Sequence, residues 1–260
     1  MADYDGTPSF YTSNEAFEKF LGQTSYYEGL QDNVVKVVSH ANPDAITEMG
    51  TGTGKTAVRL ADEFPEAEVH GIDNRESVVD ISRENANKLD LPNLTFETAD
   101  MTDYVAEVES LAEMVVCLYS FHHIPDPLER KVEFLEHCYT TLPNGGHLCI
   151  AETFLTTDAR DELARREVRS QWADRGLEGY ASTFWAALDD IDQAAVEHAQ
   201  QVGEYSREHE LEAGDRVRER DDEYLISKQW LVDQADSIGF DVVIAEPVNA
   251  LGDGIVLLRK

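Results

Sequence analysis

Residues 47–56 read TEMGTGTGKT, and this stretch decides the fold. It begins within a short apolar run, residues 45–49, and leads into a segment with helical periodicity, residues 54–64. Glycine at three alternate positions lets the backbone turn tightly and approach a ligand that a Cβ atom would exclude. A glycine-rich turn between a strand and a helix therefore predicts an α/β domain with a ligand site at this turn.

The chain on the carboxyl side of this turn alternates short apolar runs with helical segments. Further predicted strands cover residues 68–72, 94–97, 114–118, 147–151, 241–245 and 254–258. Further predicted helices cover residues 76–89, 128–141 and 228–237, the last with Ser227 as N-cap and Gly239 just past its end. This order predicts a doubly wound, Rossmann-like sheet of seven strands, mostly parallel, that ends in an antiparallel hairpin.

Two helical segments fall outside this alternation and extend the domain. The predicted organisation is an N-terminal helical lid (1–43), a Rossmann-like core (44–155 and 227–260) and a helical insertion that forms a substrate cap (156–226). Within the insertion, apolar residues recur at steps of three and four between Leu177 and His198, as on one face of an amphipathic helix.

The composition restricts the class of protein and its partners. Among 260 residues, 52 are acidic and 21 basic, giving a net charge of -31, yet the 42% hydrophobic share excludes an acidic disordered chain. The basic residues comprise 14 Arg and only 7 Lys, and this acidic, lysine-poor composition resembles that of proteins from extreme halophiles. A surface this acidic disfavours nucleic acid as a partner, because phosphates are bound by basic side chains.

The compartment follows from the termini and the cysteines. The first ten residues lack a signal-peptide pattern, and no apolar run approaches the ~20 residues of a membrane span, so we expect a cytoplasmic protein without membrane contact. Cys117, Cys138 and Cys149 lie in apolar surroundings without CxxC spacing and are expected to be buried free thiols.

Two kinds of ligand site use such a glycine-rich turn. Gly54-Lys55-Thr56 matches the end of a phosphate-binding P-loop, but Met49 stands where that motif requires glycine. The strand at 114–118 also runs into Tyr119 and Ser120, without an aspartate for Mg²⁺. A nucleoside site is favoured instead, because Asp73 ends the second predicted strand, where a carboxylate can accept hydrogen bonds from ribose hydroxyls.

Four motifs in this order resemble the class I S-adenosylmethionine-dependent methyltransferases. They are the ExGxGxG pattern from Glu48 to Gly54, Asp73 after the second strand, Asp100 after the third, and the sequence YSFHHI at 119–124 after the fourth. The sequence FHHIPDP at 121–127 is similar to the small-molecule branch related to quinone-biosynthesis methyltransferases. It differs from the nucleic-acid amino-methylating enzymes, which carry an acidic residue or Asn, then Pro-Pro and an aromatic residue there.

The resemblance implies a complete site for S-adenosyl-L-methionine, which is converted to S-adenosyl-L-homocysteine. Glu48 and the backbone of Gly50, Gly52 and Gly54 would hold the methionine end, and Asp73 the ribose. The other residues implied are Asn74 beside the adenine, Asp100 and Met101 at its amino group, the backbone of Leu118 or Tyr119 at the methionine ammonium, and Tyr11, Tyr26 or Tyr27 over the carboxylate.

Methyl transfer from a sulfonium is an in-line displacement in which alignment supplies much of the catalysis. A base helps when the acceptor must lose a proton, and His122, His123 and Glu152 are the best-placed candidates. No metal site is predicted.

We therefore expect a methyltransferase that acts on a small molecule. The alternatives are an RNA or protein methyltransferase, or a regulator that binds S-adenosylmethionine without catalysis. The acceptor atom and the oligomeric state are left open by the sequence.

Overall fold

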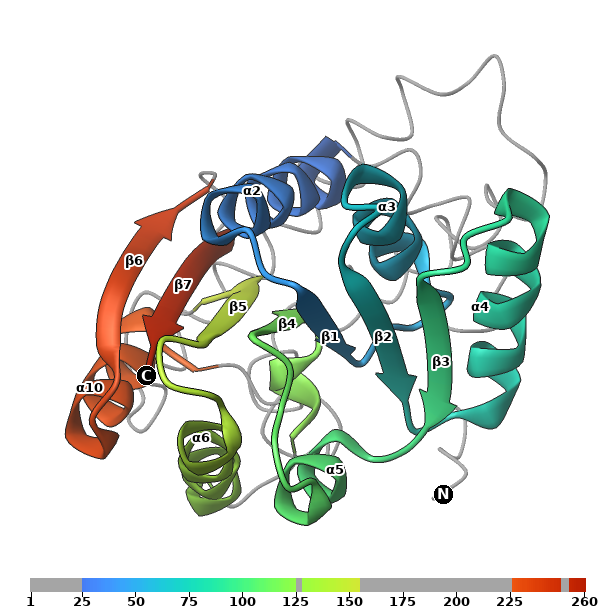
Figure 1. The fold of residues 1–260 in the computed structure, drawn as a ribbon. Helices are drawn as coiled ribbons and strands as arrows, with labels where there is room; N and C mark the ends of the chain where they lie inside the picture. The colour runs from blue at the N-terminus through green and yellow to red at the C-terminus, as the bar shows by residue number, and fades with distance from the viewer. Residues whose placement is uncertain (1–24, 125–127, 155–225, 249–252) are drawn as a thin grey trace, which may run out of the picture.

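A central sheet with helices on both faces organises the chain (Figure 1). The computed structural model describes residues 25–124, 128–154, 226–248 and 253–260. The strands are β1 (Ala45–Met49), β2 (Glu68–Asp73), β3 (Leu94–Thr98), β4 (Met114–Leu118), β5 (His147–Thr153), β6 (Asp241–Pro247) and β7 (Asp253–Arg259). They form one seven-stranded sheet in the order β3-β2-β1-β4-β5-β7-β6. The first five strands are parallel, and β7 is antiparallel to both β5 and β6. The predicted fold is confirmed.

Helices cover both faces of the sheet (Figure 1). In the described part of the chain, α2 (Ser25–Ala41), α3 (Lys55–Glu63) and α4 (Glu76–Leu89) lie on one face, and α5 (Met101–Glu107), α6 (Glu129–Thr141) and α10 (Lys228–Ile238) lie on the other. A 3₁₀ turn, η1 (Phe121–His123), follows β4. Most predicted elements agree with these bounds within two residues. Helix α5 was not predicted, because it has only seven residues and only Val105 on it is buried.

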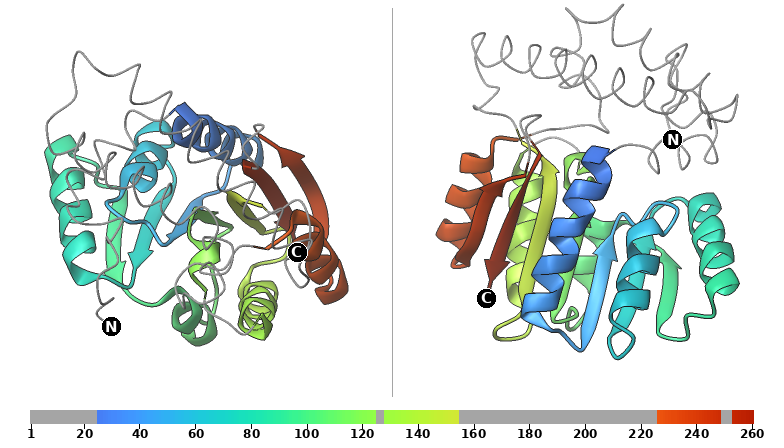
Figure 2. Two further views of the ribbon diagram at one scale, coloured as in Figure 1. Left: turned by 180° about the vertical axis from the view of Figure 1, so that it is seen from behind. Right: turned by 90° about the horizontal axis from the view of Figure 1, so that it is seen from above.

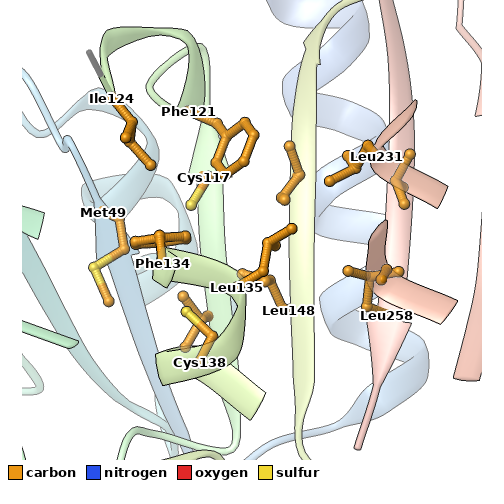
Figure 3. Packing of buried hydrophobic residues seen from close by; sticks show 14 of the residues in the cluster. Met49, Cys117, Phe121, Ile124, Phe134, Leu135, Cys138, Leu148, Leu231 and Leu258 are labelled. Atoms are coloured by element: carbon orange, nitrogen blue, oxygen red, sulfur yellow. The ribbon is translucent and has the colours of Figure 1, made fainter. Parts of the chain in front are cut away.

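Each face of the sheet has its own hydrophobic core. The cluster against α6 and α10 includes Phe121 and Ile124 from the segment after β4, which lie among Phe134 and Leu135 of α6 (Figure 3). The segment that bears the two histidines is therefore anchored in the core at both of its ends.

Helix α2 belongs to the other core. Leu30, Val34 and Val38 are fully buried, and the helix packs along β5 and β7 (Figure 2). Residues 25–41 of the predicted lid therefore form part of the core layer, and most of the lid and the predicted cap lie outside the described residues.

The C-terminal part ends the sheet as the sequence predicts. Ser227 Oγ accepts a hydrogen bond from the Trp230 N–H at 3.1 Å, and Gly239 has a φ of 117° at the end of α10. The antiparallel pairing of β5 with β7 sets Asp253 opposite Thr153, at the edge where the parallel strands end.

Two smaller expectations concern the cysteines and the membrane. Cys117, Cys138 and Cys149 are buried and free, as predicted. Burial raises the pKa of the Cys149 thiol to about 12. Within the described residues, no helix combines the length and the apolar character needed to cross a bilayer.

Candidate functional site

The five parallel strands end at one edge of the sheet, and the predicted site residues follow those ends. In open α/β sheets the crevice outside the carboxyl ends of the strands is where ligands bind. Here β1 and β4 are neighbours at the centre of the sheet. The turn after β1 and the segment after β4 therefore meet at this edge.

Close contact between these two segments explains the first glycine of the motif. Gly50 has a φ of +69°, and a Cβ atom placed on it would lie 2.5 Å from Ser120 Cβ. Only glycine fits both constraints. Gly52 differs, because its φ is +57° but a Cβ atom placed on it would meet nothing within 4 Å. Glycine at position 50 therefore allows the turn after β1 to pack against the segment after β4. Gly52 leaves open space beside the backbone of the turn at residues 50–54, which we call the cradle.

Glu48 is buried beneath this cradle. Its Oε2 accepts a hydrogen bond of 2.6 Å from Thr51 Oγ1, so the carboxyl group braces the turn from inside. Burial raises the pKa of Glu48 to about 8, against the opposing effect of hydrogen bonds from Thr51, the Ala57 backbone and Thr56. The negative charge of Asp73 adds to the increase. The contact between Glu48 and Thr51 joins the end of β1 to the turn that follows it.

Asp73 lies at the end of β2, and its carboxylate binds two backbone N–H groups. Its Oδ2 accepts the Gly52 N–H at 3.0 Å, and its Oδ1 accepts the Arg75 N–H at 3.1 Å. The Arg75 guanidinium also approaches Oδ1, with Nε at 3.4 Å. The structure thus brings Asp73 into direct contact with Gly52 of the glycine-rich turn, two residues that the sequence assigns to the same cofactor site.

Asp100 caps helix α5. Its Oδ1 accepts from the Thr102 N–H at 2.8 Å, from Thr102 Oγ1 at 2.5 Å and from the Asp103 N–H at 3.4 Å. Met101 is half-buried, and its Cε methyl lies 3.7 Å from the position of a Cβ on Gly50. Asn74, by contrast, is exposed beside Asp73.

The resemblance of Gly54-Lys55-Thr56 to a P-loop has a structural explanation. In a P-loop the hydroxyl at the last position ligates Mg²⁺. Here Thr56 is buried and its Oγ1 accepts from Gln31 Nε2 at 3.0 Å, within 3.1 Å of the Tyr27 hydroxyl. The hydroxyl therefore fastens α2 to the start of α3.

The chain turns sharply after β4. Leu118 is buried, and Tyr119 has a φ of +50°, a conformation that non-glycine residues seldom adopt. The Tyr119 ring stacks on Tyr27 with centroids 5.9 Å apart. Such strain persists where the surrounding contacts fix it, and it is concentrated at functional sites.

His122 and Glu152 form a pair across the ends of β4 and β5. His122 Nδ1 lies 2.9 Å from Glu152 Oε2, which also accepts the His122 backbone N–H at 3.3 Å. The Glu152 side chain is 1% exposed and the His122 side chain 16%. The His123 ring lies 4.0 Å from the His122 ring between centroids. All three predicted candidates for proton transfer therefore lie together.

Lys131 also belongs to this region and was not predicted from the sequence. It is fully buried, and its Nζ donates to the carbonyls of Phe121 and Ile124 at 2.8 and 2.6 Å, which bracket the two histidines. A signal was present, because position 131 lies three and four residues before Phe134 and Leu135 and so shares their apolar face.

Of the three tyrosines assigned to the methionine carboxylate, only Tyr27 has a side chain within the described residues. Tyr11 and the Tyr26 side chain lie outside the described residues. Tyr27 is described, and its hydroxyl is directed to Thr56, as given above. Among the residues that the structure describes, no group of three or more His, Cys, Asp or Glu has the arrangement of a metal site.

Comparisons with known proteins agree with this geometry. Residues 46–146 match the family model described as a methyltransferase domain. The chain is 28% identical over 132 residues to the release factor glutamine methyltransferase of Xylella fastidiosa (strain 9a5c), covering 51% of this chain and 47% of that protein. It is 25% identical over 103 residues to the ubiquinone biosynthesis O-methyltransferase of Acinetobacter baylyi (strain ATCC 33305 / BD413 / ADP1), covering 40% and 41%.

A solved structure extends the likeness beyond the matched region. The magnesium protoporphyrin IX methyltransferase of Synechocystis PCC 6803, solved with S-adenosylhomocysteine bound, superposes with a TM-score of 0.54 at 16% identity. The superposition covers 90% of this chain and 83% of that one. At this identity the likeness shows the fold. The alignments to the two curated relatives span less than half of each relative's length. Residues 46–146 therefore match a methyltransferase domain, and the chain shares the fold of a solved methyltransferase.

Proposed function

We propose that this protein transfers a methyl group from S-adenosyl-L-methionine to a hydroxyl group of a small-molecule acceptor, with His122 as the base. The observation that carries the proposal is the contact between buried Glu152, near the end of β5, and partly buried His122, after β4, beside the glycine-rich turn. A cofactor cradle and a proton acceptor thus share one edge of the sheet.

The residues of the cradle suit this cofactor. The open space at Gly52 admits a ligand close to the backbone. Asp73, at the end of β2, offers oxygens to ribose hydroxyls, and Asp100 retains Oδ2 for the adenine amino group, since its bonds to α5 use Oδ1. Asp73 and Asp100 make this edge acidic, which favours a ligand with a positively charged sulfonium.

Side chains at the ends of β4 and β5 would remove the proton from the acceptor hydroxyl. When bound, S-adenosylmethionine supplies an activated methyl group. Glu152 holds His122 through Nδ1, which leaves Nε2 to take the proton from an acceptor hydroxyl. Lys131 fixes the carbonyls on both sides of the histidines and so positions this turn. His123 is proposed to shape the pocket rather than to take the proton, since the contact with Glu152 belongs to His122.

A turnover assay tests the proposal. Labelled S-adenosylmethionine is incubated with the full chain and a panel of phenols, catechols, hydroxyquinones and hydroxy acids, alongside amines and thiols of similar size. We expect label in hydroxylated acceptors, and little or none with His122→Asn. Transfer only to amines or thiols, or unchanged transfer to hydroxyls in His122→Asn, would contradict a histidine base acting on a hydroxyl.

A protein acceptor is the second candidate, since one relative is a release factor glutamine methyltransferase. The sequence after β4 weighs against it, because Tyr119-Ser120-Phe121-His122 lacks the Pro-Pro-aromatic pattern of amino-methylating enzymes. Labelling of a cell extract separates the two candidates. Label in macromolecules with none in the small-molecule fraction would favour the protein acceptor.

A further inference from the structure

Arg75 occupies a position where arginine is a poor choice for helix formation. It is the N-cap residue of α4, with φ of -104° and ψ of 105°, and its side chain makes no capping bond. Ser, Thr, Asp and Asn are preferred there because their oxygens accept from the first free N–H groups of the helix. The side chain instead turns back to Asp73, and the Arg75–Asp73 ion pair measures 3.4 Å.

Asp73 has limited capacity for more partners. A carboxylate offers about four acceptor positions, two on each oxygen. Oδ2 accepts from the Gly52 N–H, and Oδ1 accepts from both the backbone N–H and the Nε of Arg75. One position on Oδ2 therefore remains, whereas Oδ1 is filled. A ribose that donates one hydroxyl to each oxygen needs a position on Oδ1.

The contact from Arg75 Nε is the one that can give way. At 3.4 Å it is the longest of the three, and it comes from a side chain that is 30% exposed. The other two donors are backbone N–H groups at 3.0 and 3.1 Å, held by the glycine-rich turn and by the start of α4.

We propose that the Arg75 side chain competes with one ribose hydroxyl of the cofactor for Asp73 Oδ1. This competition reduces the preference of the site for a ligand that carries this hydroxyl over one that lacks it. This inference rests on the proposed function, because it requires that Asp73 receives a ribose. Arg75 is thus a specificity-determining residue. Each ribose that binds must displace the guanidinium, so the hydroxyl at Oδ1 contributes less to affinity than the hydroxyl at Oδ2.

Calorimetric titration of the full chain with S-adenosylhomocysteine and with its 2′-deoxy and 3′-deoxy analogues tests this. The loss of affinity caused by each missing hydroxyl is measured in the wild type, in Arg75→Met and in Arg75→Ser. Methionine retains a long aliphatic stem without donors, and serine restores a preferred N-cap. We expect the loss for one analogue to increase about threefold to fivefold in both variants, and the loss for the other to stay unchanged.

Salt provides a second arm without any substitution. Raising KCl from about 0.1 to 1 M screens the Arg75–Asp73 pair in part, because Arg75 is 30% exposed and Asp73 only 8%. In the wild type, the loss of affinity caused by the missing hydroxyl should therefore shift part of the way toward the loss in the variants. In the variants, the ratio of the affinity for S-adenosylhomocysteine to that for each deoxy analogue should be the same at both salt concentrations.

The outcomes separate this inference from the proposed function. If each missing hydroxyl lowers the affinity by the same factor in the wild type and in the variants, Arg75 has no role in specificity. A smaller loss for either analogue in the variants would also overturn the proposed competition, because Arg75 would then be holding Asp73 in place for the ribose. Failure of the wild type to bind S-adenosylhomocysteine at all would instead refute the proposed function.

Discussion

The two halves of the sheet edge are built in different ways. After β1 and β2, the candidate cofactor side depends on backbone geometry, with positive φ at Gly50 and Gly52 and a backbone N–H bonded to Asp73. At the ends of β4 and β5, the candidate acceptor side depends instead on side chains: buried Glu152 paired with partly buried His122, and buried Lys131. The contact of Gly50 with Ser120 joins the two halves. Substitutions should therefore affect binding on one side and turnover on the other.

The largest effect is expected at His122. His122→Asn removes the proton acceptor while keeping a polar side chain, and kcat should fall by about 10²- to 10³-fold. The affinity for S-adenosylhomocysteine should stay within about twofold, because the cradle lies on the other half of the edge. Parallel assays of turnover and calorimetric affinity check both. Equal losses in kcat and in cofactor affinity would mean that a substitution on the acceptor side also disturbs the cofactor side.

The junction between the halves gives the next largest effect. Gly50→Ala combines a positive φ with a Cβ 2.5 Å from Ser120 Cβ, and it should lower the free energy of unfolding by about 3 kcal/mol. Gly52→Ala is the matched control, with a similar φ but open space, and should cost about 1 kcal/mol. Denaturant unfolding measures both.

A rescue variant locates the origin of that cost. Ser120→Gly in the Gly50→Ala background removes the atom that clashes and should restore about half of the lost stability. If the double variant is no more stable than Gly50→Ala, the contact between the loops does not explain the loss.

Glu48 gives a pH-dependent effect confined to the cofactor side. Its pKa is raised to about 8 by burial, so the folded state binds a proton that the unfolded state releases near pH 4.5. The resulting stability is complete below pH 4.5 and is lost as the pH rises through 8. Between about pH 5 and 8, the wild type should therefore lose about 3 to 4 kcal/mol more than Glu48→Gln, whose side chain does not ionise. Urea unfolding of both proteins across this pH range measures the difference. If the free energy of unfolding changes equally with pH in the two proteins, Glu48 is not protonated in the folded state.

The smallest effect serves as a control away from both halves. Ser227→Ala removes the N-cap bond to the Trp230 N–H and should lower the stability by about 1 kcal/mol. Cofactor affinity and kcat should both be unchanged when measured well below the midpoint of thermal unfolding. A change in either would show that α10 influences the site.

The two halves also differ in how far the sequence predicts them. The strand ends, the glycine-rich turn and the positions of Asp73 and Asp100 follow from local pattern, because each depends on neighbours within a few residues. The Glu152–His122 pair joins residues 30 apart in the chain, so the sequence predicts the candidates but not their contact. The contacts of Lys131 were missed because its side chain reaches back to carbonyls whose positions depend on the folded turn. Arg75 lies only two residues from Asp73, but the sequence does not indicate that its side chain turns back toward that carboxylate.

Titration calorimetry with S-adenosylhomocysteine, in wild type, Asp73→Ala and His122→Asn, is the decisive measurement for a cofactor site on one half of the edge. We expect one molecule bound per chain, an affinity at least about thirtyfold weaker in Asp73→Ala, and an affinity within about twofold of wild type in His122→Asn. Absence of binding to the wild type, or equal affinity in wild type and Asp73→Ala, would contradict a cofactor site built on Asp73.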